Sequence, residues 1–381
     1  MTLDNYPFDS LRTLLEHSTP STTKTQIDLT IGEPKFATPS FICEALSSYA
    51  TTLNKYPPNA GVPELVSAVS GFVKRRFDIA LGAEQFCPTF GTKEVCFNFP
   101  SYYLHDKKEP TMAFVNPYYA VYKGAAVAAK AKIFTIDLLP QNDFKPKMSD
   151  EQLQKLDLVI LNFPNNPTGC ELSLEELQEW VKLALKHDFF LINDECYSEI
   201  YRQTPPPSLL QASVSVGNEE FKNIAVLNSL SKRSSAPSIR GGFIAGDASV
   251  LKGYKVYRTY SGTTPPLPNQ LASALAWEDE HYPSLFREKY NKNFQHANDI
   301  LGIDIPSSGF FLWLAVPARY NGDDLSFAKE LFERENIKVL PGSFLCDNNV
   351  SSGYVRLAFV YEEPIIQEAL QRLNAFMQAS A

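Results

Sequence analysis

Between about residues 88 and 247, short runs of apolar residues alternate with longer amphipathic stretches. The apolar runs predict buried strands at 111–116, 156–162, 189–194, 224–229 and 242–245. Residues 173–187 predict a helix, which opens on a capping box made by Ser173 and Glu176. Continuous apolar strands separated by helices favour a mainly parallel sheet that is covered on both faces.

Polar residues follow three of these predicted strands. Residues 162–169 come after one strand, Asp194 ends the next, and residues 229–232 come after a third. In open sheets of this kind, ligands bind at the carboxyl ends of the strands. Packing alone does not require polar groups from several strands at one edge, so this edge is the predicted site.

The chain is long enough for two domains, since it has 381 residues. Residues 260–268 are rich in Gly, Thr and Pro, and a long helical stretch at 269–298 follows. Short strands at 309–316, 337–339 and 354–359 then surround a helix at 325–335. We therefore predict a large domain at 35–285 and a smaller α+β domain built from 1–34 and 286–381.

Composition narrows the possible binding partners and the cellular compartment of the protein. A net charge of −8 and a pI near 5.3 argue against nucleic acid. No apolar run approaches the roughly 20 residues that span a membrane, and the N-terminus has no secretory pattern. Six scattered cysteines predict reduced thiols in a cytoplasmic protein, and the five histidines show no spacing typical of metal ligands.

Lys232 follows the strand at 224–229 in the segment 229–242, among small hydroxyl residues and eight positions before Arg240. A lysine that forms a Schiff base needs partial desolvation, which makes its neutral amine accessible. The competing interpretation is a solvated Lys-Arg pair in a polar loop.

Asp194 closes the apolar run 189–192, and Tyr197 lies three residues later. A buried carboxylate at this place can keep a pyridinium nitrogen protonated, which makes the ring an electron sink. Alternatively, Asp194 is a helix cap or a surface acid, and Tyr197 is a core residue with a hydrogen-bonded hydroxyl.

Two loops add candidate ligands. The turn at 163–169 holds Asn166 between prolines, although a structural turn is its ordinary explanation. Gly91, Thr92 and Lys93 precede a predicted helix that Pro100 would end or kink, and such a helix start can bind phosphate. Arg240 and Ser229 would complete a phosphate site.

Seven motifs occur in an order that resembles the class I/II (fold type I) pyridoxal-phosphate aminotransferases. The resemblance covers nearly the whole chain and rests on Gly32-Glu33-Pro34, Tyr56-Pro57 with Gly61, Pro117-Tyr118-Tyr119 with Tyr122, Asn165-Asn166-Pro167-Thr168-Gly169, Asp194-Glu195 with Tyr197, Ser229-x-Ser231-Lys232 with Arg240, and Tyr354-Val355-Arg356. It implies the fold type I architecture, a large domain with a doubly covered sheet beside a smaller α+β domain.

The resemblance also implies roles. Lys232 would hold pyridoxal 5'-phosphate through an imine and later move the Cα proton, while Asp194 would pair with the ring nitrogen. Asn166 and Tyr197 would bind the ring hydroxyl, and Tyr119 would stack on the ring. The implied phosphate ligands are Thr92, Lys93 (mostly through its backbone), Ser229, Ser231 and Arg240. Arg356, with Asn166 and the backbone near Gly32, would bind the substrate α-carboxylate. Tyr56 would reach the phosphate of the neighbouring subunit, which implies a homodimer.

Some less common motif forms resemble one branch, the N-succinyldiaminopimelate aminotransferases of bacterial lysine biosynthesis. These forms are Lys35 after Pro34, the segment 54–61, Arg233 after Lys232, and the segment 242–247. The branch would exchange an amino group between glutamate and N-succinyl-2-amino-6-oxopimelate. Lys35 and Arg233 are candidate ligands for the additional carboxylates, with solvated surface charges as the alternative. Where the family usually has glycine, this chain has Ser238, which would be strained if the position needs a positive φ.

Other functions fit the same motifs. An aspartate, alanine, aromatic or kynurenine aminotransferase, or a carbon–sulfur β-lyase, would use the same Lys232 and Asp194. A pyridoxal-phosphate-binding sensor without catalysis is a more remote alternative, because such chains carry a DNA-binding domain and no helix-turn-helix fits before Gly32.

Overall fold

The computed structural model describes residue 3 and residues 5–379. Its centre is a seven-stranded sheet in the order β2-β8-β7-β6-β5-β3-β4, in which only β8 runs antiparallel to the other strands. The strands are β2 (Phe86–Phe90), β3 (Thr111–Asn116), β4 (Lys132–Asp137), β5 (Leu158–Leu161), β6 (Phe190–Asp194), β7 (Ile224–Ser229) and β8 (Gly241–Gly246). The predicted fold class, an α/β chain with a mainly parallel sheet, is confirmed.

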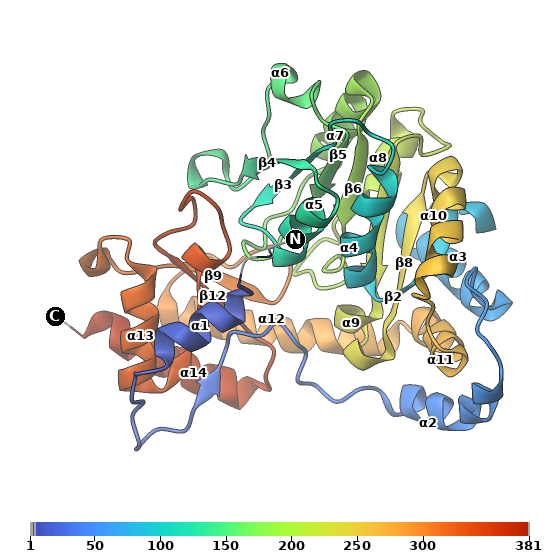
Figure 1. Cartoon of the computed structure of the whole chain (residues 1–381). Helices are drawn as coiled ribbons and strands as arrows, with labels where there is room; N and C mark the ends of the chain where they lie inside the picture. The colour runs from blue at the N-terminus through green and yellow to red at the C-terminus, as the bar shows by residue number, and fades with distance from the viewer. Residues whose placement is uncertain (1–2, 4, 380–381) are drawn as a thin grey trace.

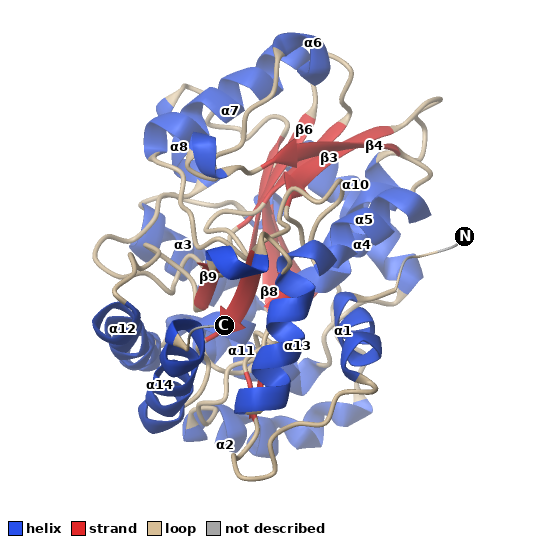
Figure 2. Ribbon diagram, turned by 90° about the vertical axis from the view of Figure 1, so that its left-hand side faces the viewer, coloured by secondary structure: helices blue, strands red, loops and turns tan. Residues whose placement is uncertain are grey.

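Helices cover both faces of this sheet, as the view along it shows (Figure 2). One face carries α4 (Thr92–Tyr103), α5 (Ala120–Ala128) and α10 (Ala248–Ser261). The other carries α2 (Ser40–Tyr49), α3 (Pro63–Phe77), α7 (Leu174–His187), α8 (Leu209–Ser215) and α11 (Leu267–Glu278). Two single-turn helices, α6 (Asp150–Leu153) and α9 (Leu230–Arg233), lie in connections.

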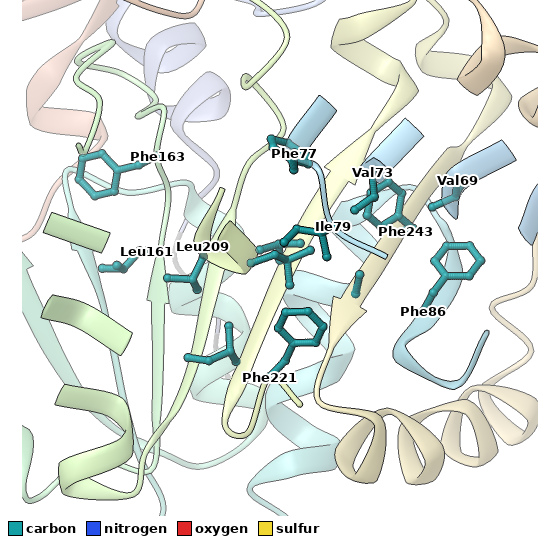
Figure 3. Close-up of a cluster of buried hydrophobic side chains, with 14 of the residues drawn as sticks. Val69, Val73, Phe77, Ile79, Phe86, Leu161, Phe163, Leu209, Phe221 and Phe243 are labelled. Carbon is teal, nitrogen blue, oxygen red and sulfur yellow. The ribbon is translucent and has the colours of Figure 1, made fainter. Parts of the chain in front are cut away.

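Alternate residues of each central strand enter opposite cores, which explains why the strands are apolar throughout. On β5, Val159 and Leu161 face the α3 side, whereas Leu158 and Ile160 face the α4 side. The α3 side includes Val69, Val73 and Phe77, which lie near Phe243 of β8 (Figure 3).

The remaining chain forms two small sheets. One is antiparallel, in the order β11-β12-β9, and the other pairs β1 with β10 in parallel. Their elements are α1 (Pro7–Leu15), β1 (Ile27–Asp28), α12 (His281–Leu301), β9 (Phe311–Ala315), α13 (Asp324–Glu335), β10 (Ile337–Lys338), β11 (Leu340–Pro341), β12 (Tyr354–Ala358) and α14 (Glu363–Gln378).

The small sheets and α12 to α14 share one apolar core that also includes Ile27 and Leu29 near the N-terminus. Figure 1 and Figure 2 show the N-terminal α1 beside the C-terminal α13. A division into residues 35–285 and the two terminal segments is consistent with this core and remains a proposal. Residues 1–2, 4 and 380–381 of the proposed small domain lie outside the described part of the chain.

Most predicted elements are present, but one predicted helix is broken in two and another does not end at Pro100. The stretch 269–298 is two helices, because the chain at Asp279 leaves the helical conformation with ψ 129° and Asp279 then accepts from the backbone N–H groups of His281 and Tyr282. The helix after Gly91 continues past Pro100 to Tyr103. Pro100 removes only its own backbone donor, and the Leu104 N–H still bonds to the Pro100 carbonyl, so the last turn forms.

No helix of the described residues is long and apolar enough to cross a membrane.

The core between α3 and the sheet makes a first prediction. Phe72 is fully buried, with its ring centroid 4.8 Å from that of Trp277. Phe72→Ala leaves a cavity there and should lower the free energy of unfolding by about 3–5 kcal/mol, measured by urea titration. Ile365→Ala on the exposed side of α14 is the control, with an expected change below about 0.5 kcal/mol. Equal midpoints for the two variants would contradict this account of the core.

Candidate active site

A cavity of about 380 Å³ lies where the carboxyl ends of the central strands meet α1 and β11. Twelve of the fifteen predicted site residues line it, namely Gly32, Thr92, Lys93, Tyr119, Asn166, Asp194, Tyr197, Ser229, Ser231, Lys232, Arg240 and Arg356. The other three, Tyr56, Lys35 and Arg233, do not. The structure therefore gathers at one edge most of the residues that the motifs singled out.

Lys232 projects into the cavity from α9, directly after β7. Its Nζ donates a hydrogen bond to the carbonyl oxygen of Gly32 and lies 5.3 Å from the ring centroid of Phe310. Burial, with a smaller contribution from the nearby Arg356 and Arg240, lowers the pKa of Lys232 to about 8, although Cys196 and Glu33 oppose this shift. Roughly a tenth of this amine is therefore neutral and nucleophilic at pH 7, far more than for an ordinary lysine.

Asp194 ends β6 as a buried carboxylate. Its Oδ2 accepts a hydrogen bond from the Tyr122 hydroxyl at 2.8 Å, and its Oδ1 accepts from the Cys196 backbone N–H at 3.2 Å. Burial raises the pKa of Asp194, while these donors oppose the rise. No cation of the described chain forms an ion pair with Asp194, so this carboxylate can accept a cationic group from a ligand.

Asn166 and Arg356 meet across the cavity. Arg356, on β12, donates from Nη1 to Asn166 Oδ1 at 3.0 Å and from Nη2 to the Thr30 carbonyl at 2.6 Å. Its Nε is buried and has no partner in the described chain, and burial lowers the pKa of Arg356 to about 10. An arginine in this state is a ready partner for a carboxylate.

The start of α4 forms an anion cradle with Arg240. Gly91 caps the helix with φ 71°, and a Cβ there would lie 2.0 Å from Arg240 Nη2, so glycine permits this approach. Arg240 Nη1 and Nη2 donate to the carbonyls of Pro237 and Phe90 at 2.8 and 3.2 Å. Free N–H groups in the first turn of α4 add to this cationic environment.

Ser229 and Ser231 lie beside this cradle, where Ser229 Oγ accepts from the Ser231 N–H at 3.1 Å. Ser238 forms part of the 3₁₀ turn Pro237–Ile239 and has no positive φ. The strained positions are instead Ser235, with φ 48°, and Arg240, with φ 54°. The expected strain at Ser238 is therefore absent.

Tyr119 and Tyr197 supply aromatic walls, and α1 covers part of the cavity. Tyr6, Pro7 and Phe8 belong to the lining, and the Lys93 Nζ lies 5.3 Å from the ring centroid of Tyr6. Burial, followed by the nearby Tyr6 hydroxyl, raises the pKa of Tyr119 above its usual value. Tyr6 thus connects the N-terminal segment to the predicted stacking residue.

Arg233 and Lys35 are corrections to the predicted substrate ligands. Arg233 is buried between helices, donates to the Ala276 and Asp279 carbonyls at 2.7 and 2.6 Å, and forms an ion pair with Glu280 at 3.0 Å. Its neighbour Lys232 on the single turn of α9 lines the cavity instead. Lys35 pairs with Glu33 at 2.8 Å outside the lining, and this hydrogen bond raises its pKa.

Sequence reasoning assigned no role to two lining residues, Tyr122 and Tyr6, and an incomplete one to Lys93. Tyr122 is buried against Asp194, and its position three residues after Tyr119, the N-cap of α5, was a usable signal. The side chain of Lys93 lines the cavity, although the prediction gave it a backbone role. Tyr6 is placed by tertiary packing, for which the local sequence holds no signal.

The lining fits pyridoxal phosphate. It contains four cations (Lys93, Lys232, Arg240 and Arg356) but only two carboxylates (Glu33 and Asp194) among the described residues. The cradle suits a phosphate, the unpaired Asp194 carboxylate suits a protonated ring nitrogen, and Lys232 suits an aldehyde.

The comparisons with known proteins agree with this geometry. The family described as "Aminotransferase class I and II" matches residues 24–373. The aminotransferase AspB of Helicobacter pylori is 48% identical, with a TM-score of 0.96 and full coverage of both chains. An aminotransferase of Neisseria meningitidis is 35% identical, with a TM-score of 0.94 over 99% of this chain and 98% of that chain.

Curated relatives extend the comparison. A 4-dedimethylamino-4-oxo-anhydrotetracycline transaminase of Streptomyces rimosus is 30% identical, covering 91% of this chain and 93% of its own. An LL-diaminopimelate aminotransferase of Maridesulfovibrio salexigens is 28% identical, covering 91% and 90%. The chain has the fold of the type I enzymes. It belongs to the class I and II aminotransferases, which use pyridoxal phosphate, and is an aminotransferase.

The lowered pKa of Lys232 makes a second prediction. For apoprotein, the rate of covalent pyridoxal phosphate attachment at Lys232, trapped with borohydride and located by peptide mapping, should rise with pH. The rise should be about tenfold per pH unit well below pH 8, because only the neutral amine reacts, and it should level off above about pH 8. A rate that keeps rising to about pH 10 would indicate an ordinary lysine.

Proposed function

We propose that this aminotransferase exchanges an amino group between glutamate and a 2-oxo acid with additional carboxylates. N-succinyl-2-amino-6-oxopimelate is the acceptor favoured by the less common motif forms. The main support for this proposal is that cationic side chains outnumber carboxylates in the cavity lining. Several curated relatives are named LL-diaminopimelate aminotransferase, which supports a substrate of the diaminopimelate type.

Each cation has a separate expected partner. Arg240 and the start of α4 offset the cofactor phosphate, and Arg356 binds the substrate α-carboxylate with Asn166 beside it. Lys232 is used for chemistry, which leaves Lys93. Among the described residues, no carboxylate forms an ion pair with the Lys93 Nζ, so Lys93 is the candidate ligand for a distal carboxylate.

In the proposed chemistry, four residues of the cavity act on the cofactor ring and on the substrate Cα. When bound, pyridoxal phosphate supplies a ring that withdraws electrons from the substrate Cα. Asp194 keeps the ring nitrogen protonated, while Asn166 and Tyr197 hold the ring hydroxyl. The Lys232 amine, with a pKa near 8, would take the proton from the substrate Cα and deliver it to the former aldehyde carbon of the cofactor.

We also propose a homodimer with Tyr56 reaching the neighbouring subunit. Tyr56 is 101% exposed, Tyr260 89%, Leu53 70% and Val256 58%, the highest values among the large apolar side chains described. They lie on two segments that Asn59 joins through its bonds to the Lys255 carbonyl and Thr259 Oγ1. Such apolar exposure favours a covering subunit. We further propose that the enzyme acts in the cytoplasm.

An aspartate aminotransferase is the second candidate, since relatives with that name match the chain. A substrate panel separates the two. With glutamate as donor, kcat/KM should be highest for N-succinyl-2-amino-6-oxopimelate, at least about tenfold above oxaloacetate, because one more satisfied charge contributes about 1.4 kcal/mol. A preference for oxaloacetate would select the second candidate. Release of pyruvate and ammonia from a sulfur-containing amino acid, with no 2-oxo acid acceptor present, would instead identify a carbon–sulfur β-lyase.

Lys93 makes its own prediction. Lys93→Met should raise KM for glutamate and 2-oxoglutarate by about five- to tenfold and KM for alanine by less than about twofold, because alanine has no distal carboxylate. Steady-state kinetics with each substrate measures this. Lys35→Met is the matched control, with an expected unchanged KM. Equal increases for alanine and glutamate after Lys93→Met would contradict the assignment.

A further inference from the structure

Arg258 on α10 is a buried arginine that lies outside the cavity lining and has no part in the chemistry above. Its side chain is fully buried, yet every nitrogen is used. Nε bonds to Glu94 Oε1 at 3.1 Å, and Nη1 bonds to Asn59 Oδ1 and Cys87 Sγ, each at 3.1 Å. Nη2 donates to the Thr263 carbonyl.

The Glu94 end of this network belongs to the anion cradle. Glu94 lies in the first turn of α4, two residues after Thr92. Its Oε1 also accepts from the Tyr254 hydroxyl at 2.9 Å, and its Oε2 accepts from the Phe90 N–H at 3.3 Å. Arg258 is therefore anchored to the helix whose start faces the cofactor phosphate.

The Asn59 end belongs to the segment that carries Tyr56. Asn59 Oδ1 accepts from Arg258 and from Thr264 Oγ1, both at 3.1 Å. Asn59 Nδ2 donates to the Lys255 carbonyl and to Thr259 Oγ1, both at 2.8 Å. Tyr56, three residues earlier, is fully exposed, and its segment is held by Asn59 and by the Pro58 carbonyl, which accepts from Gln270 Nε2 at 3.1 Å.

A buried ion pair is an uncertain source of stability, because desolvation offsets much of its attraction. An apolar residue at position 258 would fill the same space without orienting Asn59. The hydrogen bonds of Arg258 instead join two loops with defined geometry, which is a positioning role.

We propose that Arg258 is a positioning residue that acts through Asn59 and holds Tyr56 in place for the cofactor phosphate of the neighbouring subunit. The inference rests on the proposed function, which assigns Tyr56 to that phosphate. It makes cofactor affinity in one subunit depend on a buried arginine of the other.

The first test compares Tyr56→Phe, Arg258→Met and Asn59→Ala. The cofactor dissociation constant of each apoprotein is measured by fluorescence titration, and the mass is measured by light scattering. Each single variant should remain dimeric and bind pyridoxal phosphate about tenfold more weakly, the effect of one lost charged hydrogen bond. Combining Tyr56→Phe with Asn59→Ala should weaken binding no further, since both remove the same contact.

Arg76→Met is the matched control. Arg76 forms another largely buried pair, with Glu199 at 2.8 Å, but it contacts neither the cavity nor the segment that carries Tyr56. This variant should lower Tm and leave the dissociation constant unchanged. If Arg258→Met does not fold, Asn59→Ala and Arg258→Lys, which keeps the charge, decide the question. Additive losses in the double variant would overturn the proposal.

Mixed dimers test whether the effect crosses between subunits. One chain carries Asn59→Ala and the other carries Lys232→Ala, so covalent cofactor binding reports only on the Asn59→Ala chain. Its affinity should equal the native value, because Tyr56 comes from the chain with Asn59. Placing both substitutions in one chain beside a native chain should restore the tenfold loss. A loss that stays with the chain carrying Asn59→Ala overturns the inference.

The outcomes separate this inference from the proposed function. If Tyr56→Phe leaves cofactor binding unchanged, both the assignment of Tyr56 and this inference are wrong. If Tyr56→Phe weakens binding while Arg258→Met and Asn59→Ala do not, only the inference fails.

Discussion

The site depends on one buried carboxylate at the end of a central strand. Asp194 ends β6, which lies between β5 and β7, and its Oδ2 accepts from Tyr122 at 2.8 Å. The loop after β5 is tied to it, because Asn162 Nδ2 donates to the Asp194 carbonyl at 2.9 Å. Lys232 follows β7. The order of three parallel strands therefore places an acid, an amide loop and an amine side by side.

The large sheet supplies only part of the cavity. Arg356 comes from β12 of the small antiparallel sheet, and Tyr6 precedes α1. The Arg356 Nη2 bond to the Thr30 carbonyl and its Nη1 bond to Asn166 connect the small sheet, the N-terminal segment and the loop after β5. Substrate recognition thus depends on segments that are distant in the sequence, whereas the predicted cofactor contacts lie mostly within residues 92–240.

The sequence predicted the five inner strands of the central sheet, because apolar runs buried on both faces have few alternatives. It predicted neither edge strand, β2 or β4. It also predicted the cavity positions of Lys232, Asp194 and Arg356 through ordered motifs. Arg233 was misplaced because the sequence does not show that Lys232 and Arg233 lie on a one-turn helix, from which Lys232 lines the cavity while Arg233 bonds to α11. The break at Asp279 and the path of α4 past Pro100 depend on local hydrogen bonds that compete with helix periodicity. Tyr6 and Arg258 gain their roles only from tertiary packing.

Protonation of the cofactor's ring nitrogen tests the role of Asp194 most directly. Nitrogen NMR on protein loaded with ¹⁵N-labelled pyridoxal phosphate reports it without requiring turnover. At neutral pH the native protein should hold this nitrogen protonated, and Asp194→Asn should leave it unprotonated, because the neutral amide cannot offset a buried cation. An unprotonated nitrogen in the native protein, or a protonated one in Asp194→Asn, would contradict the account.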